Sequence, residues 1–286
     1  MNTATREPAT TWVPNEPPSV DWLGRSLECG SCVNQGLLTE GKCQLAFSCV
    51  FDRYAKRIDR FFRWNPGLAN DYLEHPYFEV RAVASRSADV FRLVGLMHDP
   101  DETVRLQLAL RVPQRLLTLM RSDPHREVRI RVAQRLAEIE LPTMLRDADD
   151  EVRKMVARRL PEHLLPLLAR DPDRQVRCEV ARRIGMPGLW TMAGDSQPEV
   201  RRIVAERLPS PLLEALGGDP DWLVRWTIAG RAAGALLVRL LNDDEDDVRA
   251  RAAQRWAELN APHGSANAES AGPTDITAAR TQVRHG

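Results

Sequence analysis

Lysine, aromatic residues and long apolar runs are all scarce in this chain of 286 residues. Lysine occurs only as Lys42, Lys56 and Lys154, so arginine supplies almost all of the positive charge. The 40 basic and 40 acidic residues cancel, which argues against a strong non-specific attraction to nucleic acid or membrane. There is no run of about 18 apolar residues and no apolar signal segment at the N-terminus. We therefore expect a cytoplasmic protein with no membrane contact.

Residue constellations typical of catalysis are also missing. There is no glycine-rich phosphate loop, no Ser-His-Asp arrangement and no conspicuous carboxylate pair. None of the six histidines lies at metal-ligand spacing from another. The sequence therefore predicts that the chain is not an enzyme.

A 24-residue repeat is the dominant feature of the sequence. The dipeptide Val-Arg recurs at this interval eight times, from Val80 to Val248. Numbered from that Val, position +5 is Ala, position +13 is Leu and position +19 is Asp in seven units each. Such a fixed period is the signature of a solenoid, in which each unit packs on its neighbours.

Each unit predicts one α-helix and one shorter helical turn. Asp-Pro pairs such as Asp171-Pro172 suggest an N-cap followed by the first helical residue. Apolar residues at 0, +4 and +8, such as Val152, Val156 and Leu160, form one buried stripe. Pro or Gly at +9 ends the helix. The remaining residues are too few for a second full helix, and their Leu spacing of three favours a 3₁₀ turn.

Two arginine columns accompany the repeat. We expect the Arg at +1 to lie at the edge of the buried stripe and to pair with the Asp at the start of the next helix, as a ladder between units. The Arg at +7 flanks the other side of the stripe. It is the better candidate for an exposed basic row, although a solvated face would explain it as well. The candidate partner-binding residues of this row are Arg135, Arg159, Arg183 and Arg207.

Trp222 and Trp226 depart from the repeat pattern. They lie one turn apart on one helix face of the seventh unit. Exposed tryptophans are candidates for a protein-binding hot spot. Packing against each other or against the C-terminal segment is the alternative.

Four of the five cysteines, Cys29, Cys32, Cys43 and Cys49, fall close together, which favours a metal site over disulfides. Their spacing alone leaves zinc and an iron–sulfur cluster open. The apolar pattern from residue 47 to 62 predicts a helix, with Cys43 before it and Cys49 in its early turns. The fifth cysteine, Cys178, occupies a variable column, where we expect a partly exposed thiol without a role.

The repeat resembles the leucine-rich repeat variant family. The pattern Asp…Val-Arg…Ala-x-Arg-Leu-Pro…Leu-Leu matches best over residues 147–168 and 195–216. The resemblance implies an all-α fold, a right-handed superhelical solenoid of alternating α- and 3₁₀-helices. Proteins of this type can carry an N-terminal four-cysteine domain. The resemblance therefore implies a [4Fe–4S] cluster as cofactor, held by Cys29, Cys32, Cys43 and Cys49, with a zinc ion on the same four cysteines as the alternative.

These features divide the chain into four segments. They are a flexible N-terminus (1–20), an iron–sulfur domain (21–66), a solenoid of eight repeats (67–260) and a disordered tail (261–286). We expect a macromolecule-binding scaffold with a protein partner, whose cluster is structural or redox-sensing. The alternatives are an electron-transfer accessory to a redox enzyme, and nucleic-acid binding through the Arg rows. A monomer is consistent with the sequence.

Overall fold

The structure, a computed structural model, describes residues 17–261. Within this range it consists of helices and loops without a strand, and two isolated β-bridges join Val20 to Ser26 and Gln44 to Ser48. No helix between residues 17 and 261 is long and apolar enough to cross a membrane. Residues 1–16 and 262–286, which make up most of the two segments expected to be flexible or disordered, lie outside the described residues.

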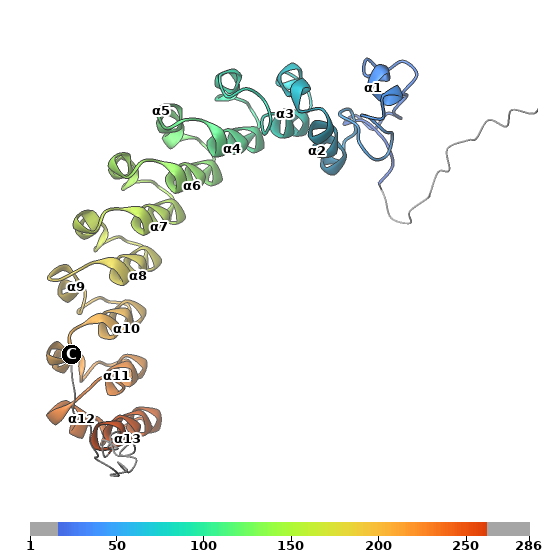
Figure 1. Ribbon diagram of the computed structural model, residues 1–286. Coiled ribbons are helices and arrows are strands. Elements are labelled where there is room, and N and C mark those ends of the chain that lie inside the picture. The colour runs from blue at the N-terminus through green and yellow to red at the C-terminus, as the bar shows by residue number, and fades with distance from the viewer. Residues whose placement is uncertain (1–16, 262–286) are drawn as a thin grey trace, which may run out of the picture. The chain divides into compact units, whose positions relative to one another are not determined.

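The chain divides into two compact units, and the division falls between Val204 and Ala205, within the residues of α10 (Pro198–Arg207). The first unit begins with α1 (Gln35–Thr39) and α2 (Ala55–Trp64). The helices that follow, one to a repeat, are α3 (Phe78–Ala84), α4 (Glu102–Arg111), α6 (Arg126–Arg135), α7 (Asp150–Arg159) and α8 (Arg174–Arg183). Figure 1 shows α4, α6, α7 and α8 stacked side by side.

Shorter helices alternate with these, as the repeat predicts. In the first unit they are η1 (Pro66–Tyr72), η2 (Arg92–Leu96), α5 (Gln114–Leu117), η3 (Thr118–Ser122), η4 (Glu138–Met144), η5 (Glu162–Leu168) and α9 (Gly188–Thr191). The second unit contains η6 (Ser210–Leu216), α11 (Trp222–Ala229), α12 (Gly234–Leu240) and α13 (Asp246–Asn260). Most of the short segments are 3₁₀-helices, and α5, α9 and α12 adopt α geometry instead, so the predicted alternation of α- and 3₁₀-helices is confirmed.

The core of each repeat is the stripe that the sequence predicts. Val152, Val156 and Leu160 are completely buried, and so are Ala157 at +5 and Leu165 at +13. A side chain as small as that of Ala leaves room for the neighbouring helix to approach closely. Each repeat therefore buries its apolar face only by stacking on a neighbouring repeat.

The start of each repeat helix differs from the prediction by two residues. The residue at −3 is the N-cap, and the carboxylates of Asp149, Asp173 and Asp221 accept N–H bonds from the first turn. The column Asp lies two residues earlier. Asp171, for example, accepts the N–H of Asp173 at 2.9 Å, in an Asx turn that precedes the cap. The assignment of this column as the N-cap is therefore wrong.

The Arg column at +1 forms the predicted ladder. Arg153 donates from Nε and Nη2 to the two carboxylate oxygens of Asp171, at 2.8 and 2.9 Å, and from Nη1 to the carbonyl of Asp147 at 2.8 Å. Each Arg thus fixes the loop before its own helix and the loop of the next repeat. The equivalent ion pairs are Arg81–Asp99, Arg105–Asp123, Arg129–Asp147, Arg177–Asp195 and Arg225–Asp243.

Candidate metal centre

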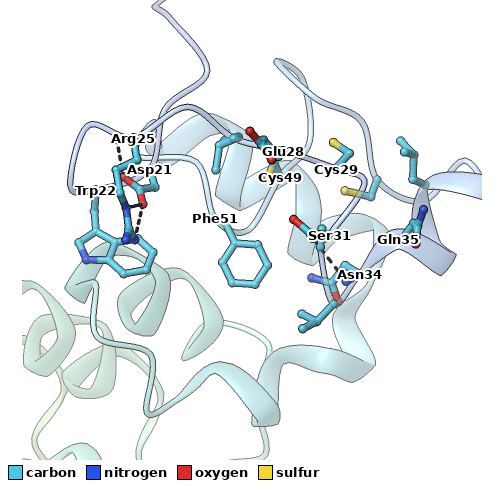
Figure 2. A pocket seen from close by; sticks show the side chains of 15 residues that line it. Asp21, Trp22, Arg25, Glu28, Cys29, Ser31, Asn34, Gln35, Cys49 and Phe51 are labelled. Carbon is cyan, nitrogen blue, oxygen red and sulfur yellow. Dashed lines mark hydrogen bonds and ion pairs between the residues drawn. The ribbon is translucent and has the colours of Figure 1, made fainter.

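The four clustered cysteines line one cavity of about 290 Å³ in the first unit. Figure 2 shows this cavity, with Cys29, Cys49 and Phe51 labelled on its walls. Cys43 and Cys49 are buried, whereas Cys29 and Cys32 are partly exposed, and all four are free thiols. The structure therefore brings together every cysteine of the predicted ligand set.

A tight turn places Cys43 beside Cys49. Gln44 and Ser48 exchange two backbone hydrogen bonds, of 2.9 and 2.8 Å, and Ala46 completes the turn with a left-handed φ of 63°. The two cysteines flank this bridged pair, and their thiols are hydrogen-bonded to each other. This turn therefore positions two of the four cysteines, and no residue of the repeats takes part in it.

The segment after Cys49 is a loop, so the prediction that Cys49 lies in the early turns of a helix is wrong. Helix α2 begins only at Ala55. A buried ion pair fixes the loop before it, with Arg57 Nη1 2.9 Å from Asp52 Oδ2. The N–H of Cys49 donates to the Arg57 carbonyl at 3.2 Å. Arg57 and Asp52 are not recognisable from the sequence as a buried pair, because the apolar pattern around them suggests that charged residues face solvent.

Backbone N–H groups point at three of the four sulfurs. The N–H of Asn34 donates to Cys32 Sγ at 3.4 Å. The N–H groups of Gln44 and Phe51 donate to the sulfurs of Cys43 and Cys49, respectively. Such bonds favour the deprotonated, metal-binding form of a thiol and are a feature of iron–sulfur sites.

The pKa shifts of the thiols follow from their mutual proximity. The hydrogen bond from the Cys49 thiol lowers the pKa of Cys43, while the same hydrogen bond and burial raise the pKa of Cys49. Burial raises the pKa of Cys29, and the charges of Cys49 and Cys32 raise it further. Thiolates held this close repel one another, and a cation bound among them would offset the repulsion.

A single metal ion would require the four sulfurs to lie close together. Four sulfurs bound to one zinc ion at about 2.3 Å would lie only about 3.8 Å from one another. In residues 17–261, no three His, Cys, Asp or Glu side chains converge closely enough to hold a single ion. The cavity between the thiols measures about 290 Å³, and its lining holds all four cysteines together with polar residues such as Asp21 and Glu28.

The Arg column at +7 is not an exposed basic row. Arg135 donates to the carbonyls of Ala109 and Val112, at 2.6 and 3.3 Å. Arg159 and Arg183 are also half-buried and bind carbonyls of the preceding repeat, and Arg207 is the last residue of α10. The carbonyls at a helix C-terminus lack helical partners and carry partial negative charge, so an Arg caps them well. The expectation of an exposed row is corrected accordingly.

The exposure of the two tryptophans agrees with the prediction from the sequence, whereas that of the fifth cysteine does not. Trp222 and Trp226 are both partly exposed on α11. The guanidinium of Arg251, from α13, lies 5.3 Å from the centroid of the Trp226 ring, as the alternative of packing on the C-terminal segment suggests.

Cys178 is only 3% exposed, so the expectation of a partly exposed thiol is wrong. Burial raises the pKa of the thiol.

Two family models match the chain. The one described as "LRV protein FeS4 cluster" matches residues 19–71, which include all four clustered cysteines. The one described as "Leucine rich repeat variant" matches residues 150–173 and 198–221. The first match covers the cysteines that line the cavity, and the second covers parts of the repeats.

Two known proteins are similar over longer stretches. A solved structure, "A leucine-rich repeat variant with a novel repetitive protein structural motif", is 42% identical and has a TM-score of 0.76, covering 80% of this chain and 98% of that chain. The "Uncharacterized 27.7 kDa protein in nifB 3'region" of Rhodobacter capsulatus is 54% identical over 101 residues. That match spans 35% of this chain and 41% of the curated relative, so the chain covers less than half of that protein's length.

Proposed function

Because this chain belongs to the leucine-rich repeat variant family, and the family's FeS4 domain matches its N-terminal part, we propose that Cys29, Cys32, Cys43 and Cys49 hold a [4Fe–4S] cluster. The observation that carries the proposal is the single cavity lined by all four thiols. A cluster bound there supplies one-electron chemistry. The repeats act as a scaffold that binds a protein partner.

The unequal exposure of the four thiols supports a redox role. Cys43 and Cys49 anchor the buried side of the cavity, whereas Cys29 and Cys32 reach its open side. Electrons and oxidants would therefore have access at the Cys29–Cys32 loop. This favours redox sensing or electron delivery to a bound enzyme over a purely structural cluster.

One surface of the first unit supports the scaffold role. We define the carboxylate-free edge as positions +14 to +18 of the first five repeats, namely residues 94–98, 118–122, 142–146, 166–170 and 190–194. It contains no Asp or Glu. Leu119 and Leu167 on this edge are 66% and 63% exposed, and a groove of about 830 Å³ lies beside Leu119.

The arginines of the carboxylate-free edge differ from those on the repeat helices. Arg126, Arg158 and other exposed arginines of the helices form ion pairs with carboxylates. Arg146 and Arg170 on the edge are not buried and have no carboxylate partner within residues 17–261. Exposed leucines among unpaired arginines fit a protein segment with apolar and acidic side chains.

The cluster is tested by purifying the protein without oxygen. About four iron atoms per chain and a broad absorption band near 400 nm are expected. Cys43→Ser should lose the iron, while Cys178→Ser, the matched control far from the cavity, should keep it. A colourless protein with one zinc ion would establish the alternative of zinc bound by the four cysteines.

The scaffold role is tested with a photoreactive amino acid placed at position 167, on the carboxylate-free edge. The control carries it at Arg182, which is exposed on α8 and paired with Glu179. A defined protein cross-linked from position 167 and not from position 182 is the expected result. Equal cross-linking from both positions would contradict the assignment of the edge as the binding surface.

A further inference from the structure

Helix α2 has one buried face and one face that is open to solvent. Its buried apolar residues are Ile58, Phe61 and Phe62. Lys56, Arg60 and Trp64 follow one another at intervals of four residues, so they form one row along the helix. Lys56 is exposed, Arg60 is half-buried and Trp64 is 40% exposed. The row therefore presents charged and aromatic side chains that the apolar core does not use.

The turn between Cys43 and Cys49 adds a second aromatic ring to this row. Phe47 of the turn is 39% exposed, and its ring centroid lies 5.7 Å from that of Trp64. The guanidinium of Arg60 lies 4.1 Å from the centroid of the Phe47 ring, and Arg60 Nη1 donates to the Phe47 carbonyl at 3.2 Å. These contacts fix two large rings that remain open to solvent. We call Phe47, Lys56, Arg60 and Trp64 the aromatic–basic patch.

A single residue joins this patch to the buried thiols. Ser48 follows Phe47 in the chain and precedes Cys49. The carbonyl of Ser48 accepts a hydrogen bond from Cys43 Sγ at 3.3 Å. Cys43 and Cys49 both line the cavity of the candidate metal centre. Covalent bonds and one hydrogen bond therefore connect the patch with two of the four candidate ligands.

The positive charge of the patch is not balanced by nearby carboxylates. Lys56 and Arg60 have no carboxylate partner within residues 17–261. Asp59, which lies between them on α2, forms ion pairs with Arg63 and Arg86. Exposed aromatic rings serve as hot spots of protein interfaces, and opposite charges steer two proteins together. The patch thus fits an acidic protein surface.

We propose that the aromatic–basic patch is the docking surface of an acidic one-electron carrier protein, which reduces the cluster by way of the turn between Cys43 and Cys49. The inference rests on the proposed function, because it requires a cluster among the thiols. The carrier loses one electron and the cluster gains it, and no bond forms or breaks. The small extent of the patch suits such a partner, since weak redox encounters bury less than about 1,200 Å².

The test uses an acidic plant-type [2Fe–2S] ferredoxin as the probe and the full-length protein purified without oxygen. Titration calorimetry measures binding at ~0.02 M salt and at ~0.5 M salt, where charges on the surface are screened. Stopped-flow absorbance follows the reoxidation of reduced ferredoxin. We expect binding that weakens at high salt, and reoxidation of the ferredoxin when it is mixed with the wild type.

Two variants perturb the patch. Trp64→Ala should weaken binding roughly 30-fold, because it removes an aromatic anchor. Lys56→Glu should slow electron transfer about tenfold at low salt and have little effect at high salt, because it acts on electrostatic steering. Iron content and reduction by dithionite, which needs no docked protein, should equal those of the wild type in both variants.

The controls make the same changes elsewhere. Trp256→Ala alters a tryptophan that is 44% exposed on α13, and Arg174→Glu reverses an exposed charge on α8. Both should bind the ferredoxin as the wild type does. Equal weakening by the controls would overturn the inference, because net charge or general hydrophobicity would then explain the binding.

The remaining outcomes separate this inference from the proposed function. If the wild type contains iron and is reduced by dithionite, but does not bind or reoxidise the ferredoxin, the inference is wrong and the proposed function stands. Patch variants with wild-type affinity and rate would lead to the same conclusion. If Trp64→Ala loses its iron, Lys56→Glu decides. If the wild type contains no iron, both proposals are wrong.

Discussion

Replacing Arg153 by Met should loosen the contact between two neighbouring repeats. The Arg153 and Asp171 side chains are only 10% and 3% exposed, and Arg153 joins α7 to the loop before α8. Met keeps the apolar length of the side chain and removes the guanidinium. The carboxylate of Asp171 would then be buried with one remaining hydrogen-bond donor among residues 17–261, the N–H of Asp173.

The cost of this change follows from the burial of the pair. Removing one partner of a buried ion pair destabilises by about 3–5 kcal/mol, because the other charge stays behind without compensation. Since a repeat array is stabilised by interactions between nearest neighbours, the loss should concentrate in α7 and α8. At about 1.36 kcal/mol for each factor of ten, backbone amides there should exchange about two to four orders of magnitude faster.

Hydrogen exchange followed by mass spectrometry measures this effect repeat by repeat. A single unfolding midpoint would average over units whose cooperativity differs. Arg146→Met is the matched control, because Arg146 lies on the surface of the adjacent repeat and has no carboxylate partner in residues 17–261. Its exchange should stay within a few fold of wild type.

The double variant Arg153→Met/Asp171→Leu separates the ion pair from its burial. Two apolar residues leave no buried charge, so most of the protection of α7 and α8 should return. Exchange in Arg153→Met within about threefold of wild type would refute the reasoning. So would a double variant as exposed to exchange as the single one.

Three further variants test other features. In Arg135→Met, the carbonyls of Ala109 and Val112 lose their donor, so exchange at the end of α4 should reflect a loss of about 1–3 kcal/mol; a variant as stable as wild type would reopen the case for an exposed basic row. Ala46→Gly should raise stability to denaturant by up to about 1 kcal/mol, because Gly tolerates the left-handed φ of 63°. The hydrogen bond from Arg225 lowers the pKa of Asp243 below 3.8, so the unfolded chain binds a proton at this carboxylate more readily than the folded chain does. The protection of α11–α13 against hydrogen exchange should therefore fall as the pH drops below about 4. In Arg225→Met this fall should be less steep.

The register of the repeat made the ladder predictable, but not every detail around it. Arg153 and Asp171 are 18 residues apart, and their helical positions alone bring them to one edge of the stripe. The N-cap was misplaced because the loop carries Asp171 and Asp173 two residues apart, and both accept N–H bonds. Which Asp caps the helix and which forms the preceding turn becomes clear only from the backbone conformation of the loop.

The cysteine domain was less predictable, because nothing repeats in it. The apolar spacing after Cys49 is compatible with a helix, and only the Gln44–Ser48 turn and the buried Arg57–Asp52 pair show that the helix starts later. Charged residues within an apolar pattern give no sign of whether they are buried together. The set of four cysteines was recognisable from spacing, while their arrangement around one cavity was not.

The constancy of the Arg column at +7 is itself a sign of a structural role. It is filled in seven successive repeats from Arg111 to Arg255, whereas position +2 varies freely. When the same residue occupies one position in every repeat, it meets the same requirement in every repeat. The surrounding feature that recurs in this way is the neighbouring repeat. Such a column therefore indicates stacking, as Arg135 shows.

The carboxylate-free edge shows the opposite pattern. Its exposed positions hold Leu119, Thr143 and Leu167 in successive repeats, so stacking places no common demand on them. What its five segments share is the absence of acidic residues. A constraint on charge without a constraint on identity is what an acidic partner would impose, since charge complementarity acts over several ångströms and tolerates exchange of individual side chains.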